Sequence, residues 1–443
     1  MRRILILGAG LSSSSLIRYL LTFASTCRWQ VRIVDRDIEL VKKKIDGHLH
    51  GFALSFNALD SKERKSEIEN ADLVISMLPA RFHIDIAKDC IQYKTNLITP
   101  SYVSPEMKAL HNDAIKAGIL IMNEIGVDPG IDHMSACKII DEIREKGGKI
   151  VSFKSYCGGL ISPESDNNPW NYKFTWNPRN VVLAGQGGAA KYIEENEYKY
   201  IPYTQLFTRL DHISIDGYGS FEGYVNRDSL SYRHIYGLDD IPTIFRGTLR
   251  RPGFSEAWNI FVQLGMTDDT YSIENAENIT SRTFLNTFLP YSEGESVENK
   301  FKRLVSKDNN MLFEKFAWLG FFDKNEVVGF ENATPAQILE NILVKKLSLN
   351  PKDKDMLVMH HVFYYVINGT KKKITSSMVN IGEDQIYTAM SNTVGLPIGI
   401  CAKMILNDEI HLKGVQIPVM KEVYEPILNE LHTLGISFKE IWE

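Results

Sequence analysis

The sequence predicts an α/β fold that begins with a doubly wound parallel sheet. Three observations predict it: a short apolar run opens the chain, a glycine-rich turn follows, and strand-like and helix-like segments then alternate to about residue 123. Short apolar runs are typical of parallel strands that are buried on both faces. Strand–helix alternation is typical of a parallel sheet covered by helices.

The first predicted strand is Ile4–Leu7, and the turn Gly8–Ser13 (GAGLSS) follows it. This turn is G-x-G-x-x-G with Ser13 in the third glycine position. The first glycine permits the tight turn, the second lets backbone approach a pyrophosphate, and a small third residue permits close helix packing. A helix predicted over 14–24 would offer its N-terminal N–H groups to phosphate. Such turns also occur by chance, so the strand before it and the helix after it are what favour a dinucleotide site.

The second predicted strand, Val31–Val34, is followed by two residues that affect the choice between NAD and NADP. Asp35 follows it, about 20 residues beyond the glycine turn, where an acid can accept hydrogen bonds from both ribose hydroxyls. Asp35 would repel a 2′-phosphate and favours NAD. Arg36 can instead pair with that phosphate and favour NADP, or be only a solvated side chain. We expect NAD, and Arg36 leaves NADP open.

The remaining elements of this domain continue the alternation. Ser104 is expected to cap a helix, with Pro105 at its first position. The further predicted strands are 51–56, 73–77, 96–99 and 119–123, and the predicted helices are 61–70, 82–93 and 105–117.

The carboxyl ends of the strands define the expected ligand edge, because ligands of an open α/β sheet lie there. Segments 76–79, 99–105 and 123–133 fall at this edge. Asp128-Pro129-Gly130 can be only a turn.

The last of these segments is rich in ionisable residues. Glu124, Asp128, Asp132 and His133 lie within ten residues. Asp132 can be only a helix cap and His133 only structural, yet a turn needs no such set. We expect a site role for Asp128, and leave Glu124 and His133 open between a site role and a structural one.

The segment Ser155–Gly185 mixes aromatic and amide side chains. It holds Trp170 and Trp176 together with Asn168 and Asn177, and it is too irregular for a plain helix or strand. We expect a rigid loop that lines a polar pocket.

Bulk properties exclude several classes of protein. The chain has 443 residues, which predicts more than one domain. Its net charge of −5 gives no indication of a basic surface that would bind nucleic acid. Basic runs at 42–44 and 371–373 are expected to be solvated. No apolar run reaches the roughly 20 residues of a membrane span, and no signal peptide is expected before Ile4.

Metal and disulfide chemistry are not expected either. The five cysteines show no C-x-x-C spacing, which argues against a zinc site or disulfides and favours a reducing, cytoplasmic location. His360 and His361 are adjacent on a predicted strand and so point to opposite faces.

A series of motifs covers nearly the whole chain, and through them the sequence resembles the saccharopine reductase family, the glutamate-forming saccharopine dehydrogenases. The motifs stand in the family's order and are specific together, whereas the glycine turn alone fits many enzymes. They are SYVSP at 101–105, NEIGVDPGIDH at 123–133, YCGG at 156–159, PE at 163–164, NPWNYKFTW at 168–176, NRDS at 226–229, RGTLR at 246–250, GF at 253–254 and AMSNTVGLP at 389–397.

The resemblance implies three parts. They are a Rossmann dinucleotide-binding domain (1–135 plus about 386–443), a mixed α/β substrate-binding and dimerisation domain (about 136–260 plus 350–385) and a small helical domain (about 261–349). In agreement, the sequence predicts helices at 278–288, 297–304 and 335–347, a strand at 356–367 with a turn at 368–369, a helix pair around Pro397 within 385–406, and a terminal helix near 420–434.

The implied activity interconverts saccharopine with L-glutamate and 2-aminoadipate 6-semialdehyde in lysine metabolism. Hydride would pass to or from NAD or NADP through an imine, and the resemblance also implies a homodimer. Two rivals remain: a related imine-reducing dehydrogenase such as a carboxynorspermidine synthase, and a non-catalytic nucleotide-binding protein. The segment 168–176 argues against the first, and the presence of Asp128, Arg227 and Arg246 argues against the second.

Site residues follow from the same resemblance. Arg227 and Arg246 can each bind a carboxylate through two hydrogen bonds, and Asp128 is the hypothesised acid or base. The substrate site would comprise Ser101, Tyr102, Asp128, Arg227, Arg246, Gly247 and Thr248. The cofactor site would comprise Gly8, Ala9, Gly10, Leu11, Ser12, Asp35, Arg36, Asp37, Asn57, Ala58, Ser76, Met77, Leu78, Ser101, Tyr102, Val127, Asp128, Pro129 and Trp176.

Structural readings of these residues stay open. Arg227 can form a salt bridge with Asp228, Arg246 can lie on the surface before a strand, and Trp176 can be a packed core residue. Cys157 is expected in a glycine-rich turn, lining the pocket. Arg233, Arg250 and Arg251 are weaker candidates and are expected to be structural.

Overall fold

The computed structural model describes residues 1–305 and 310–443. By its internal contacts the chain divides into two compact units. One unit comprises Met1–Ile150, His234–Leu238 and Met359–Glu443, and the other comprises Val151–Arg233 and Asp239–Val358. The division into three domains expected from the sequence remains a prediction.

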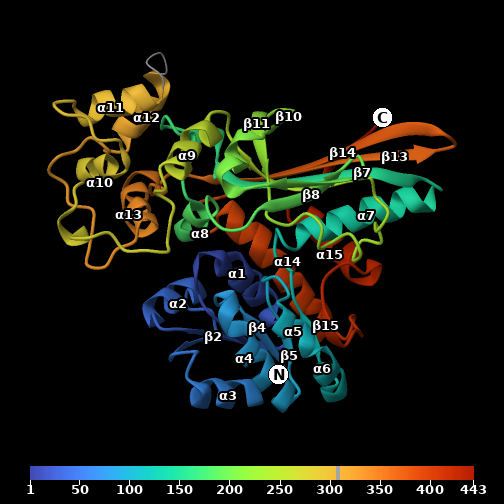
Figure 1. Ribbon diagram of the computed structural model, residues 1–443. Helices are drawn as coiled ribbons and strands as arrows, with labels where there is room; N and C mark the ends of the chain where they lie inside the picture. Colours follow the sequence, from blue (N-terminus) through green and yellow to red (C-terminus); the bar gives the residue numbers. More distant parts are fainter. Residues whose placement is uncertain (306–309) are drawn as a thin grey trace. The chain divides into compact units, whose positions relative to one another are not determined.

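The first unit is built on a seven-stranded parallel sheet with the order β15-β6-β5-β4-β1-β2-β3. Figure 1 labels four of these strands, β2, β4, β5 and β15. Its strands are β1 (Arg2–Leu7), β2 (Trp29–Asp35), β3 (Gly51–Ser55), β4 (Leu73–Ser76), β5 (Asn96–Ile98), β6 (Leu120–Met122) and β15 (Gly414–Gln416). Every neighbouring pair is parallel. The order reverses at β1, so the predicted doubly wound sheet is confirmed.

Helices cover this sheet. They are α1 (Ser14–Ala24), α2 (Ile38–Ile45), α3 (Ser61–Glu69), α4 (His83–Tyr93), α5 (Pro105–Ala109) and α6 (His111–Ala117). Ile68, Cys90, Met107 and Ala114, on α3 to α6, share one core with Leu5 of β1. The single helix predicted over 105–117 is two short helices that meet at Leu110. The predicted Ser104 cap is confirmed, because its Oγ accepts a hydrogen bond from the Met107 N–H at 3.1 Å.

Three longer helices complete the first unit: α7 (Ile131–Glu145), α14 (Ala389–Leu406) and α15 (Lys421–Thr433). The expected helix pair around Pro397 is wrong, since α14 runs unbroken with Pro397 inside it. Burial along its whole length outweighs the hydrogen bond that proline cannot donate. Among the described residues, α14 is the one helix that is long and apolar enough to cross a membrane. However, 78% of it is buried inside the structure, as expected of a core helix.

Most of a β-hairpin also belongs to the first unit, from Met359 onward. β13 (Asp355–Ile367) and β14 (Thr370–Ile381) are joined at Asn368-Gly369, where both residues have positive φ (50° and 75°). This is the predicted turn, and its left-handed conformation suits the twist of the hairpin. β14 pairs antiparallel with β16 (Lys439–Trp442).

The second unit is built on a mixed sheet. β10, β11 and β12 are antiparallel neighbours, β12 is parallel to β7, and β8 pairs with both β12 and β9. Its strands are β7 (Lys149–Ile161), β8 (Ala190–Glu194), β9 (Glu197–Ile201), β10 (Asp211–Ile215), β11 (Gly219–Val225) and β12 (Thr243–Arg250). The expected second, mixed α/β layer is therefore confirmed.

The helices of the second unit surround an aromatic core. They are α8 (Pro178–Leu183), α9 (Phe254–Gln263), α10 (Ser281–Phe288), α11 (Val297–Leu304), α12 (Asn310–Trp318) and α13 (Pro335–Leu347). Trp170 is fully buried, stacks on Phe261 with ring centroids 5.6 Å apart, and donates its indole N–H to the Lys315 carbonyl at 3.0 Å.

Ser155–Gly185 is not the single loop expected from the sequence. Its first residues complete β7, and 178–183 form α8. The amide side chains satisfy local groups: Asn168 accepts from the Trp170 N–H and donates to the Tyr172 carbonyl, and Asn177 caps α8. Asn168 is buried and supplies partners for the backbone of its own turn, which explains why it occurs next to the buried Trp170.

Candidate functional site

The glycine turn after β1 has the geometry that a dinucleotide needs. Gly8 has a φ of +102°, and a Cβ there would lie 3.2 Å from the Met77 carbonyl oxygen. A Cβ at Gly10 would meet nothing within 4 Å, so the backbone is open on that side. Ser13 is buried and donates to the Gly10 carbonyl at 2.8 Å. The turn therefore leaves room for a phosphate before α1.

Lys44 lies against this turn, which corrects the expectation that the run 42–44 is solvated throughout. Its Nζ donates to the Gly10 carbonyl at 2.5 Å and to Ser13 Oγ at 3.1 Å. Burial lowers the pKa of this amine to about 8, against the opposing effect of Asp35. The structure thus adds a cation beside the phosphate turn.

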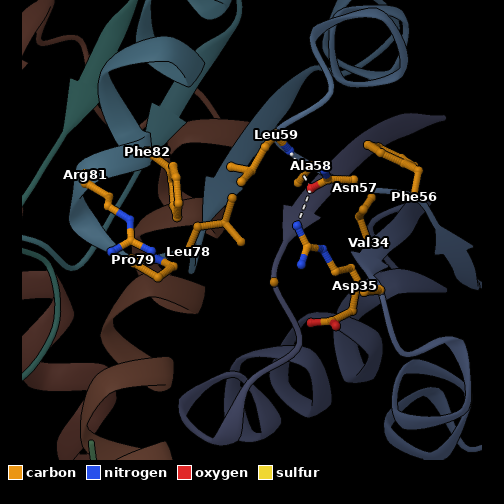
Figure 2. Close-up of a pocket in the computed structure, with 12 residues that line it drawn as sticks. Val34, Asp35, Phe56, Asn57, Ala58, Leu59, Leu78, Pro79, Arg81 and Phe82 are labelled. Atoms are coloured by element: carbon orange, nitrogen blue, oxygen red, sulfur yellow. Dashed lines mark hydrogen bonds between the residues drawn. The ribbon is translucent and has the colours of Figure 1, made fainter. Parts of the chain in front are cut away.

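A cavity of about 270 Å³ lies beyond the carboxyl ends of β1 to β4. Six predicted cofactor residues line it: Gly8, Asp35, Arg36, Asn57, Ala58 and Leu78. Figure 2 shows Leu78, Pro79, Arg81 and Phe82 on one side and Val34, Asp35, Phe56 and Asn57 on the other. This is the edge at which an open α/β sheet binds its ligand.

The side chains of Asp35 and Arg36 contact different groups. The Asp35 carboxylate accepts from the Ala9 N–H at 2.7 Å and from the Asp37 N–H at 3.2 Å. Asp37 itself caps α2. Arg36 is exposed and donates to Asn57 Oδ1 at 3.0 Å, and both residues line the cavity.

Arg81 is a second guanidinium on this cavity, and sequence reasoning missed it. It is exposed and stacks over the Phe82 ring at 4.6 Å, just beyond the end of β4. Its position after a strand end was the available signal, because that edge is where ligands lie.

His83 connects the ends of β4 and β5. Its Nδ1 is 2.9 Å from Ser76 Oγ, and its Nε2 is 2.8 Å from the hydroxyls of Thr99 and Ser101. The imidazole is 3% exposed, and burial lowers its pKa to about 4. It is therefore neutral at pH 7 and holds the predicted cofactor residues Ser76 and Ser101 by hydrogen bonds.

Tyr102 and Asp128 are brought together beyond β5 and β6. The Tyr102 hydroxyl donates to Asp128 Oδ1 at 3.1 Å, and Tyr102 remains 50% exposed. A cavity of about 380 Å³ is lined by Tyr102 together with His83, Arg81, Glu106 and Asn123, among others. A hydroxyl and a carboxylate in contact, with solvent access, form a pair that can bind or move a proton.

The loop that carries Asp128 is closely tied. Asp128-Pro129 is a cis peptide bond, the Gly126 N–H donates to the Pro129 carbonyl at 2.9 Å, and the Gly130 N–H donates to Asp132 Oδ1 at 2.6 Å. Asp132 thus serves the backbone of this loop.

The predicted substrate residues of the second unit lie just after the end of β11 and within β12, where Val225 pairs with Gly247. Arg227 is exposed and donates to the carbonyls of Leu183 and Gln186 at 2.9 and 2.8 Å. Within the described residues it forms no ion pair with Asp228, which pairs with Lys191 instead. The expected salt bridge is therefore wrong, because the Arg227 side chain turns toward the residues after α8.

Arg246 lies inside β12 and is 4% exposed, so the surface alternative is wrong. Its guanidinium lies 4.5 Å over the Tyr232 ring. Gly247 follows it, and a Cβ there would come within 2.8 Å of the Tyr224 carbonyl oxygen. Thr248 donates to Asn226 Oδ1 at 2.7 Å.

Two further expectations change in the second unit. Cys157 is not in a turn but inside β7, opposite Thr248 of β12. Trp176 is 40% exposed, so it is not a packed core residue. That Trp176 lies beside the nicotinamide remains a prediction.

His360 and His361 contact different hydroxyls from one strand, Ser377 Oγ and Ser135 Oγ, each at 2.8 Å. Across the described residues, no three His, Cys, Asp or Glu side chains gather as metal ligands would.

Two family models match almost the whole chain. The saccharopine dehydrogenase NADP binding domain matches residues 4–122, and the saccharopine dehydrogenase C-terminal domain matches residues 126–436. The chain belongs to the saccharopine dehydrogenase family. The resemblance inferred from the motifs is thereby confirmed.

Curated relatives place the chain within this family. It is 35% identical to the saccharopine dehydrogenase [NADP(+), L-glutamate-forming] of Saccharomyces cerevisiae, over 88% of both chains. It is also 35% identical to the mitochondrial alpha-aminoadipic semialdehyde synthase of Mus musculus, over 99% of this chain and 47% of that protein. The chain thus spans about half the length of the mammalian relatives that it matches. These names support a nicotinamide cofactor and do not support the NAD preference expected from Asp35.

Solved structures agree with the fold. The apo saccharopine dehydrogenase (L-Glu forming) of Saccharomyces cerevisiae superposes with a TM-score of 0.90 at 31% identity, and each chain is covered completely. The homospermidine synthase of Legionella pneumophila, solved with NAD, has a TM-score of 0.57 at 10% identity and shares the fold alone.

Proposed function

We propose that the chain is an oxidoreductase that interconverts saccharopine with L-glutamate and 2-aminoadipate 6-semialdehyde in lysine metabolism. The observation that carries this proposal is the match, over its full length, to the glutamate-forming yeast enzyme at a TM-score of 0.90. The nucleotide cavity and the Tyr102–Asp128 pair lie on the same strand-end edge in the first unit, which suits this chemistry.

The reaction requires a hydride acceptor and proton transfers. Oxidation of the secondary amine removes a hydride from carbon and a proton from nitrogen, and the nicotinamide ring accepts the hydride when it is bound. Water then adds to the resulting imine, and the carbon–nitrogen bond breaks to release glutamate and the aldehyde. The protein must hold three carboxylates, exclude competing water and move protons at nitrogen and oxygen.

Asp128, with Tyr102, is the proposed acid and base. The two side chains are 3.1 Å apart, and the exposed face of Tyr102 leaves the pair open to a ligand. A proton can pass between the pair and the substrate nitrogen or an adding water molecule.

Arg227 and Arg246 are the proposed carboxylate ligands. Arg227 is bonded within the described residues only to carbonyl groups, so its charge is not already neutralised by Asp228. Arg246 is buried against Tyr232, where low exposure strengthens its pairing with an anion. Ser101, Gly247 and Thr248 complete the proposed substrate site.

We propose NADP as the preferred cofactor, in place of NAD. Arg36 and Arg81 both line the nucleotide cavity and can pair with a 2′-phosphate. The Asp35 carboxylate, which would repel that phosphate, accepts the Ala9 and Asp37 N–H groups instead. The name of the matched NADP binding domain supports the same choice.

An absorbance assay of cofactor reduction with saccharopine tests the activity and the cofactor in one experiment. We expect turnover with NADP that exceeds turnover with NAD. Absence of saccharopine-dependent reduction with either cofactor would overturn the activity, and faster reduction of NAD would overturn the cofactor preference alone.

A homodimer and a cytoplasmic location are part of the proposal. All five cysteines are free of disulfides, which is typical of a reducing compartment. Size-exclusion chromatography with light scattering tests the dimer, and cell fractionation tests the location.

A further inference from the structure

Glu124 is a buried carboxylate held in an unusual backbone conformation. It is 4% exposed, follows β6, and has a φ of +55°. Residues with a Cβ rarely adopt this left-handed region, and they do so when their surroundings fix them there. Burying a carboxylate is also unfavourable unless hydrogen bonds compensate it. Both costs point to a specific task for this side chain.

The contacts of Glu124 surround Tyr102. Its N–H donates to the Ser101 carbonyl at 3.2 Å, and its Oε1 accepts from the Val103 N–H at 2.8 Å. Glu124 therefore holds the residue before Tyr102 and the residue after it. The Tyr102 backbone is thus held on both sides, and its hydroxyl donates to Asp128 Oδ1 at 3.1 Å.

The other Glu124 oxygen connects to α7. Oε2 lies 2.9 Å from His133 Nε2, and His133 Nδ1 lies 2.5 Å from the Tyr236 hydroxyl. His133 is 0% exposed and Tyr236 is 4% exposed. His133 stands in the first turn of α7, directly after the loop that carries Asp128. The pair Glu124–His133 thus links the two ends of this loop.

Tyr236 comes from a distant part of the sequence. Its segment, His234–Leu238, belongs to the first unit. Arg144, at the other end of α7, donates to the carbonyls of Tyr236 and Gly237 at 3.0 and 2.7 Å. Both the side chain and the backbone of Tyr236 are therefore held against α7, and its hydroxyl position is well defined.

We propose that Glu124, His133 and Tyr236 are positioning residues that set Tyr102 against Asp128 for proton transfer. This rests on the proposed function. Glu124 fixes the backbone on both sides of Tyr102, His133 anchors Glu124 to the start of α7, and Tyr236 fixes the orientation of the His133 ring. All three act through other residues, and Tyr102 and Asp128 remain the groups that meet the substrate.

Steady-state kinetics of three variants tests the proposal. Glu124→Ala is expected to lower kcat by about 10- to 100-fold, since misplacement of about 1 Å costs that order of rate. Glu124→Gln keeps an acceptor for the Val103 N–H and a polar group for His133, and should retain kcat within about threefold. Tyr236→Phe removes one oxygen atom and should lower kcat by about 3- to 10-fold.

Tyr424→Phe is the matched control. Its hydroxyl is bonded to Asp141 Oδ2 at 2.6 Å, so this change also removes a tyrosine hydroxyl that contacts α7, away from Tyr102. We expect it to lower Tm without lowering kcat. The proposal is overturned if Tyr236→Phe and Glu124→Ala have the same kcat as this control. Should Glu124→Ala fail to fold, the Tyr236→Phe comparison decides alone.

Amide hydrogen exchange gives a readout that needs no activity. The Val103 amide should exchange faster in Glu124→Ala than in wild type and in Tyr424→Phe, because its acceptor is removed. Unchanged exchange would overturn the proposed positioning of Tyr102. A wild-type chain that does not oxidise saccharopine would instead overturn the proposed function, and the exchange result would still decide whether Glu124 holds this segment.

Discussion

Asp35 and Arg36 are neighbours in the chain, yet their side chains serve different groups. The Asp35 carboxylate accepts the Ala9 and Asp37 N–H groups, while the Arg36 guanidinium lines the nucleotide cavity. The sequence showed both residue types and their distance from the glycine turn, but not the direction of either side chain. Direction depends on which backbone N–H groups lack partners, and this is set by the folded turn.

Arg36 is expected to determine the preference for NADP over NAD. Arg36→Ala should raise the KM for NADP by about 10- to 100-fold, because a hydrogen bond to a charged group contributes about 1.5–3 kcal/mol. The KM for NAD should change by less than about threefold, since NAD lacks the phosphate. Arg2→Ala, an exposed arginine at the start of β1, is the control. Equal loss with both cofactors would contradict pairing with a 2′-phosphate.

Asp128 is expected to transfer protons. Asp128→Asn should lower kcat by about 10²-fold, which is the order contributed by a general acid or base. Steady-state rates across saccharopine concentrations measure this. An unchanged kcat with a raised KM for saccharopine would show that Asp128 only binds the substrate.

His83 is expected to make stability depend on pH. Burial lowers its pKa to about 4, whereas an unfolded histidine titrates near 6.5. Between these values the unfolded chain binds more protons, so the free energy of unfolding falls as pH falls from about 6.5 to 4, by up to about 3 kcal/mol. His360 also has its pKa lowered to about 4 and acts in the same window. Denaturant unfolding should show a weaker pH dependence in His83→Gln, and an identical dependence would rule out His83 as its source.

Helix α14 shows what a pattern can and cannot predict at the scale of an element. The strands and helices of the parallel sheet end close to the predicted residues, because buried parallel strands and glycine turns leave clear local patterns. Pro397 suggested a break in α14, but contacts with α1 keep the helix intact. Those contacts need glycine: a Cβ at Gly395 would lie 2.7 Å from the Leu16 nitrogen.

Gly395→Ala is therefore expected to destabilise the protein by about 1–3 kcal/mol, the usual cost of overpacking. Thermal unfolding measures the loss. Gly188→Ala is the control, because a Cβ there meets nothing within 4 Å and Gly188 is exposed. Equal Tm values for the two variants would show that α14 and α1 separate without cost.

At the scale of the whole molecule, family membership was predictable because motifs recur from residue 101 to residue 397. The Glu124–His133–Tyr236 contacts were not, since Tyr236 lies 103 residues beyond His133 in the chain. A long-range contact of this kind leaves no local periodicity. The fold and the strand-end edge could thus be predicted from the sequence. The contacts among Glu124, His133 and Tyr236 could be identified only from the three-dimensional structure.

NADP is expected to stabilise the folded chain by mass action. At 100 times its Kd it should raise the free energy of unfolding by about 2.7 kcal/mol, and NAD at the same concentration should raise it less. Thermal unfolding with each cofactor measures this. A larger shift with NAD would contradict the proposed preference.

Because most of the free cysteines are buried, their reaction with an alkylating reagent reports local opening of the structure around them. Cys90, Cys137 and Cys401 are enclosed, and burial raises the pKa of the Cys137 and Cys401 thiols to about 12, while Cys27 is only partly buried. Thiolate is the reactive form, so an alkylating reagent should modify Cys27 quickly and the enclosed thiols only when their surroundings open. Cys90 lies on α4 and Cys137 on α7, so their separate alkylation rates would time the opening of each helix.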